Sequence, residues 1–102
     1  MQTTHLKRVT IIAEALLEKA LLRDIKSLGA TGYTITTARG EGSRGVRASD
    51  WEGGNIKLET LVSESTAHKI LEQVSSSYFE HHAVIAYLES VEVVRGEKYL
   101  GK

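Results

Sequence analysis

The chain has 102 residues, of which 41% are hydrophobic, and it contains no cysteine. A chain of this length supports one hydrophobic core, so we expect a single domain over residues 1–102. The absence of cysteine excludes disulfides, thiolate nucleophiles and Cys-ligated zinc. Basic and acidic residues balance at 13 each, which argues against a nucleic-acid-binding protein held by overall charge. No apolar run reaches the roughly 18 residues that a membrane span needs, so we expect a cytoplasmic protein without membrane insertion.

The first third of the chain has the pattern of a strand followed by a helix. Residues 6–13 (LKRVTIIA) are rich in β-branched side chains and alternate, which predicts a strand. From Glu14 onward the apolar residues recur every three to four positions, which predicts an amphipathic helix. We expect this helix to end at Gly29, because glycine readily adopts the left-handed conformation that commonly terminates helices. Its apolar positions are Leu17, Leu21, Ile25 and Leu28.

The rest of the chain predicts three more strands and a second helix. Residues 32–38 and 55–62 are β-rich, and residues 83–94 form a long final strand. Residues 63–65 (SES) offer an N-cap and an early acidic residue for a helix. The apolar stripe of that helix consists of Ala67, Ile70, Leu71, Val74 and Tyr78. We expect the polar tail, residues 95–102, to fray or to add a short edge strand.

The resulting order βαββαβ predicts an α+β, ferredoxin-like domain. In this arrangement a four-stranded antiparallel sheet carries both helices on one face. The other face is left uncovered, and there we expect Ile12, Leu61 and either Tyr87 or Ile85 to be exposed. Such an apolar patch is typical of a partner surface, so we expect a homo-oligomer.

A long connection, residues 39–54, joins the two middle strands; we call it the glycine-arginine loop. Connections longer than about 12 to 15 residues in a compact domain are usually functional or disordered. Glycines such as Gly42 permit turned backbone whose N–H groups converge on an anion. Arg44 and Arg47 add planar donors that match phosphate oxygens, and Ser43 adds a hydroxyl. This composition predicts an anion site, although a plain solvated hairpin extension also fits the pattern.

The second half of the loop has a different character. Trp51 lies next to Asp50 in an otherwise polar segment. A large aromatic side chain in such a position is typical of an interface anchor. We therefore expect Asp50 and Trp51 to face a protein partner.

The segment GATGYTITTARGEGSRGVRAS, at residues 29–49, resembles the PII-like signalling proteins, in particular the SbtB and carboxysome-associated PII branch. The shared run is close to GYT…G-x-GSR-x-VR-x-S, and the resemblance covers nearly the whole chain. The stretch VRGE, at residues 94–97, is similar to the Arg-Thr-Gly-Glu stretch that closes the last strand of classical PII proteins, shortened by one residue. The modifiable loop tyrosine of classical PII proteins is missing, because the only loop aromatic is Trp51.

The resemblance implies a homotrimer that binds adenine nucleotides (AMP, ADP, ATP or cyclic AMP) in clefts between neighbouring subunits. It also implies bicarbonate as a second ligand, and a loop whose conformation reports the ligand to a target such as a bicarbonate transporter or a carboxysome-related protein. By the resemblance, the cleft would be lined by Gly32, Tyr33, Thr34, Gly42, Glu89 and Val91. The phosphate contacts would be Ser43, Arg44, Arg47 and Arg95.

Other function classes have less support in the residues. A metal-binding trimer of the same fold, of the copper-tolerance type, would use His68, His81 or His82. Adjacent strand residues point in opposite directions and the histidines lack ligand spacing, so we expect a surface turn at His81-His82 and no metal. No nucleophile elbow or His–carboxylate pair is recognisable, so we expect no enzyme. A regulatory domain that binds an amino acid at its sheet edges stays open as a third class.

Overall fold

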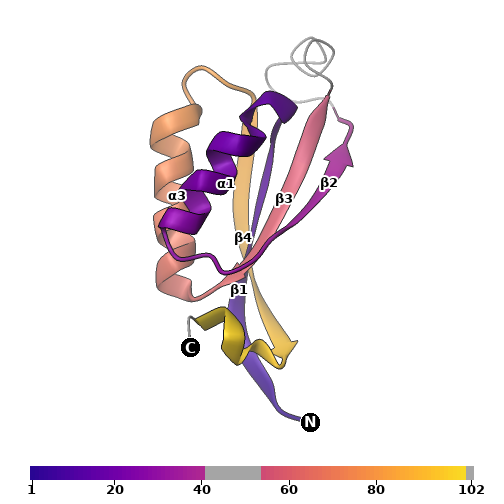
Figure 1. Cartoon of the computed structure of the whole chain (residues 1–102), viewed down its shortest axis with the longest axis vertical. Coiled ribbons are helices and arrows are strands. Elements are labelled where there is room, and N and C mark those ends of the chain that lie inside the picture. The colour runs from indigo at the N-terminus through magenta and orange to yellow at the C-terminus, as the bar shows by residue number, and fades with distance from the viewer. Residues whose placement is uncertain (41–53, 101–102) are drawn as a thin grey trace.

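The structure is a computed structural model that describes residues 1–40 and 54–100. They form one antiparallel sheet in the order β2-β3-β1-β4, with α1 and α3 on the same face (Figure 1). This confirms the predicted ferredoxin-like α+β arrangement, with β1 and β3 in the centre of the sheet. In the described part of the chain, no helix is both long and apolar enough to cross a membrane.

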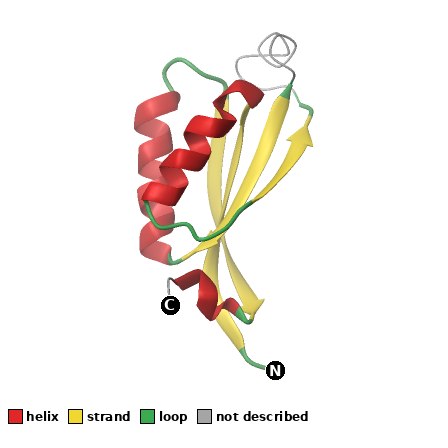
Figure 2. Ribbon diagram, in the orientation of Figure 1, coloured by secondary structure: helices red, strands yellow, loops and turns green. Residues whose placement is uncertain are grey.

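The strands follow the predicted pattern closely (Figure 2). They are β1 (Thr3–Glu14), β2 (Thr34–Ala38), β3 (Asn55–Val62) and β4 (Val84–Val94). Strand β3 has the predicted bounds. Strand β1 begins earlier than predicted, because its first residues pair with the end of β4, Thr3 opposite Val94. Strand β2 begins later than predicted, at Thr34 instead of Gly32.

The helix ends agree with their sequence signals. Helix α3 (Glu64–Tyr78) begins after Ser63, whose hydroxyl accepts a hydrogen bond from the Thr66 N–H at 3.2 Å. Helix α1 (Glu18–Ser27) is preceded by a 3₁₀ turn, η1 (Ala15–Leu17), where the sequence had predicted a continuous helix. Gly29 has a φ of +118°, so the left-handed termination predicted there is confirmed.

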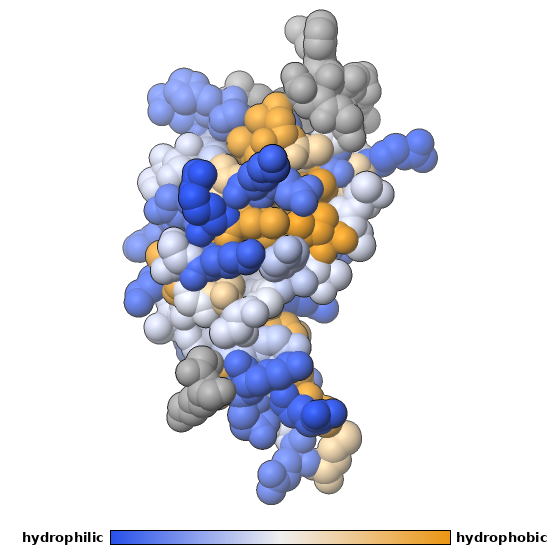
Figure 3. Space-filling model, in the orientation of Figure 1, coloured by the Kyte–Doolittle hydropathy of each residue, from blue (hydrophilic) through white to orange (hydrophobic). Residues whose placement is uncertain are grey.

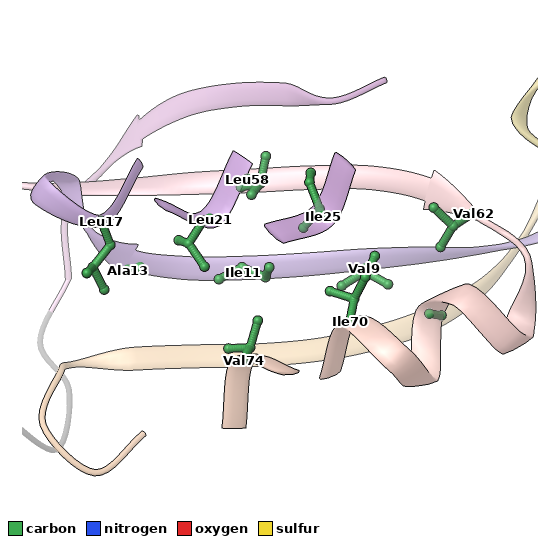
Figure 4. Packing of buried hydrophobic residues seen from close by; sticks show 11 residues of the cluster. Val9, Ile11, Ala13, Leu17, Leu21, Ile25, Leu58, Val62, Ile70 and Val74 are labelled. Carbon is green, nitrogen blue, oxygen red and sulfur yellow. The ribbon is translucent and has the colours of Figure 1, made fainter. Parts of the chain in front are cut away.

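The core lies between the helices and the sheet (Figure 4). Alternate residues of the central strands point toward the helices, and the apolar stripes of both helices meet them. The buried cluster comprises Val9, Ile11, Ala13, Leu17, Leu21, Ile25, Leu58, Val62, Ala67, Ile70 and Val74. Leu71 and Tyr78 of the predicted stripe pack against its edge.

Neither α1 nor α3 covers the other face of the sheet. Ile85 is 51% exposed and Tyr87 is 41% exposed, so both of the alternative residues contribute to the predicted patch. Ile12 and Leu61 are half-buried. The patch is also polar on one side, because Arg8 of β1 pairs with the carboxylate of Glu89 on this face.

The described part of the C-terminal tail corrects the expectation of fraying or an edge strand. Residues Gly96–Leu100 form a 3₁₀ helix, η2, that packs on β1. Gly96 is buried there, and the Thr4 hydroxyl donates a hydrogen bond to the Glu97 carboxylate at 3.2 Å. Arg95 adopts a left-handed φ of 61°, which turns the chain out of β4. η2 packs here because the first residues of β1 extend far enough to contact it.

Tyr78 links the two helices, and its ionisation provides a test of the packing. Its hydroxyl donates a 2.5 Å hydrogen bond to the Asp24 carboxylate. Burial, followed by this hydrogen bond, raises the pKa of Tyr78 to about 12, from a reference near 10. The folded state therefore holds this proton more tightly than the unfolded state. The stabilisation is complete below about pH 10 and is lost as the pH rises toward 12.

We expect the free energy of unfolding to fall more steeply between about pH 10 and 12 in the wild type than in Tyr78→Phe. The difference is at most about 2.7 kcal/mol, less the solvent screening of this partly exposed ring. Urea denaturation at a series of pH values measures it. Equal slopes for the wild type and Tyr78→Phe would contradict the assignment.

Candidate ligand-binding site

A pocket of about 540 Å³ lies where the segment before β2, the end of β3 and η2 meet. In Figure 1, η2 is the short yellow helix near the C-terminus, in the lower part of the molecule, and Figure 3 shows hydrophilic side chains around it. The pocket is lined by Arg8, Thr31, Gly32, Tyr33, Thr34, Glu59, Thr60, Leu61, Lys98 and Tyr99.

The segment before β2 is held in place by a side chain of β3. The Thr60 hydroxyl donates a 2.6 Å hydrogen bond to the Gly32 carbonyl. Tyr33 is 45% exposed, and the Lys26 ammonium lies 5.5 Å from its ring centroid. Three of the residues predicted to line a cleft, Gly32, Tyr33 and Thr34, thus lie together on one pocket wall.

A charged cluster forms the floor of the pocket on the open sheet face. The Nη2 atom of Arg8 lies 2.6 Å from Oε1 of Glu89, and the Nε atom of Arg8 lies 3.8 Å from Oε2 of Glu59. The hydrogen bond to Glu89 is the main cause that raises the pKa of Arg8. Arg8 and Glu59 line the pocket, whereas Glu89, predicted as a cleft residue, lies beyond its edge and holds Arg8.

The remaining predicted site residues are not brought to this pocket by the described structure. Val91 pairs with Leu6 and is not among the lining residues, and neither is Arg95, which is exposed. Six predicted residues lie outside the described residues: Gly42, Ser43, Arg44, Arg47, Asp50 and Trp51. Their roles stay predictions.

The pocket and the base of the glycine-arginine loop lie at opposite ends of the same two strands (Figure 1). At the pocket end Thr34 pairs with Glu59, and at the loop end Ala38 pairs with Asn55. At about 3.3 Å per residue, the two pairs are separated by roughly 13 Å along β2. A second cavity, of about 520 Å³, lies at the loop end and is lined by Thr37, Ala38, Arg39, Gly54 and Asn55.

The histidines considered as metal ligands do not come together. His81 and His82 lie in the turn after α3, as predicted, and His68 is one helical turn from Glu64. His82 Nδ1 lies 3.5 Å from a Glu14 carboxylate oxygen. Within residues 1–40 and 54–100, no three His, Cys, Asp or Glu side chains form a group that could hold a metal ion.

Sequence reasoning did not place Arg8, Glu59, Lys98 and Tyr99 in the pocket. Arg8 and Glu59 each lie in a strand whose alternate residues point toward the core. Both occupy polar positions between those residues, so both lie on the sheet face away from the core. Their proximity depends on the register, in which Arg8 pairs with Leu61 and Glu59 with Thr10. Lys98 and Tyr99 carried no signal, because a polar tail gives no indication that it folds back.

Together, the fold and the pocket define a small α+β protein of the ferredoxin-like class, with a concave site that carries both signs of charge. The family model of nitrogen regulatory protein P-II matches residues 6–98, and the chain belongs to this family.

Solved structures agree with this assignment. A PII-like signalling protein from Thermus thermophilus is 63% identical; the match covers 98% of this chain and 100% of that chain, with a TM-score of 0.86. CPII from Thiomonas intermedia K12, a nitrogen regulatory PII-like protein bound to ADP, AMP and bicarbonate, is 25% identical over 97% of each chain, with a TM-score of 0.84. CPII bound to ADP and bicarbonate is 26% identical over 96% of this chain and 97% of that chain, with a TM-score of 0.83.

Proposed function

We propose that this PII-family protein is a nucleotide-sensing regulator of inorganic-carbon metabolism in the cytoplasm. It binds adenine nucleotides, with bicarbonate as a further ligand, in clefts between the subunits of a homotrimer. The observation that carries the proposal is the preformed pocket at the start of β2, in a chain that resembles CPII over nearly its whole length. The structure of CPII contains bound ADP, AMP and bicarbonate.

The separation of the pocket from the loop base supports a site shared between subunits. The pocket offers the aromatic rings of Tyr33 and Tyr99 and hydroxyls, which suit an adenine and a ribose. The anion-binding residues predicted from the sequence belong to the glycine-arginine loop, whose base lies at the other end of β2 and β3. A ligand that contacts both would use the pocket of one subunit and the loop of its neighbour. The exposed sheet face with Ile85 and Tyr87 offers an apolar surface for that assembly.

In this proposal the nucleotide acts by biasing the conformation of the glycine-arginine loop. A ligand shifts a conformational equilibrium only by the difference in its affinity for the two states. Phosphate contacts from the loop arginines would supply that difference, and Asp50 and Trp51 would present the result to a target. The SbtB-like and carboxysome-associated motif suggests that the target is a bicarbonate transporter or a carboxysome-related protein. The role is regulatory and involves no catalysis.

Calorimetric titration with AMP, ADP, ATP and cyclic AMP tests the proposal. We expect saturable binding of at least one of them at sub-millimolar concentration, with one site per chain. Adenosine and a guanine nucleotide serve as controls for the phosphate and for the base. No binding of any adenine nucleotide at millimolar concentration would contradict the proposal. Native mass spectrometry separates it from the copper-tolerance alternative, for which a metal would bind stoichiometrically without nucleotide.

A further inference from the structure

The charges around the pocket are not equally available to a ligand. Within the described residues, three charged side chains line it: Arg8, Glu59 and Lys98. Arg8 is engaged by two carboxylates, at 2.6 Å from Glu89 and 3.8 Å from Glu59. Arg8, Glu59 and Glu89 together carry a net charge of −1, since one guanidinium faces two carboxylates. An anion placed beside Arg8 would therefore meet more negative than positive charge.

Lys98 is in a different position. In the part of the chain that the structure describes, no carboxylate pairs with its ammonium group. The ammonium lies 5.1 Å from the centroid of the Tyr99 ring, which also lines the pocket. A cation without a counter-ion in a concave wall is available to bind an anion without first breaking an ion pair.

We infer that Lys98 is the pocket's own contact for the phosphate of the nucleotide, and that Arg8 is a positioning residue that holds Glu59. The inference rests on the proposed function and adds to it a cation from the same subunit as the pocket. It differs from the sequence-based assignment, in which the phosphate contact at this end of the chain was Arg95.

The structure also explains how a lysine near the chain end is positioned. Lys98 follows Gly96, whose close packing on β1 leaves no room for a side chain: a Cβ there would lie 2.8 Å from the Cβ of Thr4. The Thr4 hydroxyl also bonds the Glu97 carboxylate. Two adjacent contacts thus hold η2 against the sheet, so Lys98 reaches the pocket before any ligand is bound.

The test compares Lys98→Gln with Lys69→Gln, which removes an exposed lysine of α3. Calorimetry with adenosine, AMP and ADP on the full-length protein gives the dissociation constants. Lys98→Gln should weaken AMP and ADP by about 10- to 100-fold, the range for a charge-assisted hydrogen bond, and adenosine by less than about 2-fold. Lys98→Arg should restore most of the loss, and Lys69→Gln should bind like the wild type.

Arg8→Gln tests the positioning role. If Arg8 only orients Glu59, its loss should weaken adenosine and ADP by the same factor. A selective loss for ADP in Arg8→Gln, together with wild-type affinity in Lys98→Gln, would overturn the inference and leave the proposed function standing. So would equal losses for adenosine and ADP in Lys98→Gln. Failure of the wild type to bind any of the nucleotides would overturn the proposed function itself, and the inference with it.

Discussion

Replacing both loop arginines, in Arg44→Ala combined with Arg47→Ala, is expected to weaken ADP binding by about 10²- to 10⁴-fold. Each arginine would donate charge-assisted hydrogen bonds to phosphate, worth about 1.5–3 kcal/mol. Adenosine has no phosphate, so its affinity should change by less than about 3-fold. Calorimetric titration of both ligands into the variant and the wild type measures the two ratios.

The matched control for this pair is Arg23→Ala, which removes an exposed arginine of α1. It should leave both affinities unchanged, because α1 packs on the core and does not line the pocket. Equal losses of adenosine and ADP in the double variant would show that the loop arginines do not contact phosphate.

Gly96→Ala is expected to weaken adenosine by about 10-fold or more and ADP by a larger factor, because the proposed phosphate contact Lys98 would leave the pocket together with Tyr99. The added Cβ would lie 2.8 Å from the Thr4 Cβ and 3.2 Å from the Val93 Cβ. These two residues pair across β1 and β4, so their backbone cannot give way easily. The easier movement is for η2 to leave the sheet, taking Lys98 and Tyr99 out of the pocket wall. Calorimetry measures the affinities, and chemical denaturation should show a loss of about 1–3 kcal/mol in stability.

Repeating the Gly96→Ala substitution in a second background identifies the cause of its effect. In a variant that already has Lys98→Ala and Tyr99→Ala, the glycine substitution should change ligand affinity by less than about 2-fold, because the wall it displaces is already lost. If it weakened binding as strongly in that background as in the wild type, displacement of η2 would not be the reason.

Sequence patterns predicted the bounds of helices and strands well where those bounds depend on residues close together in the sequence. Strand β3 has the predicted bounds because Ile56, Leu58 and Val62 alternate toward the core. Ser63 and Gly29 mark helix ends through chemistry that acts within a few residues. The sequence also predicted the face of β4 that carries Ile85 and Tyr87, although not that both would be exposed.

The candidate site was less predictable because it is assembled from distant segments. Arg8 meets Glu89 across a ladder that joins opposite ends of the chain. The fold of η2 depends on Gly96 fitting against Thr4, and no periodicity in the tail reports such a fit. Gly32, Tyr33 and Thr34 were found through a motif resemblance, not through any physical signal that periodicity or charge provides.

A crystal structure of the protein with ADP tests the central claim most directly. Adenine and ribose should lie in the pocket between residues 31–34, Glu59 and η2, with Lys98 within hydrogen-bond distance of a phosphate oxygen. The phosphates should approach Arg44 and Arg47 of a neighbouring subunit. ADP bound wholly outside this pocket, or with its phosphates remote from Lys98 and from every glycine-arginine loop, would rule out the proposed nucleotide site.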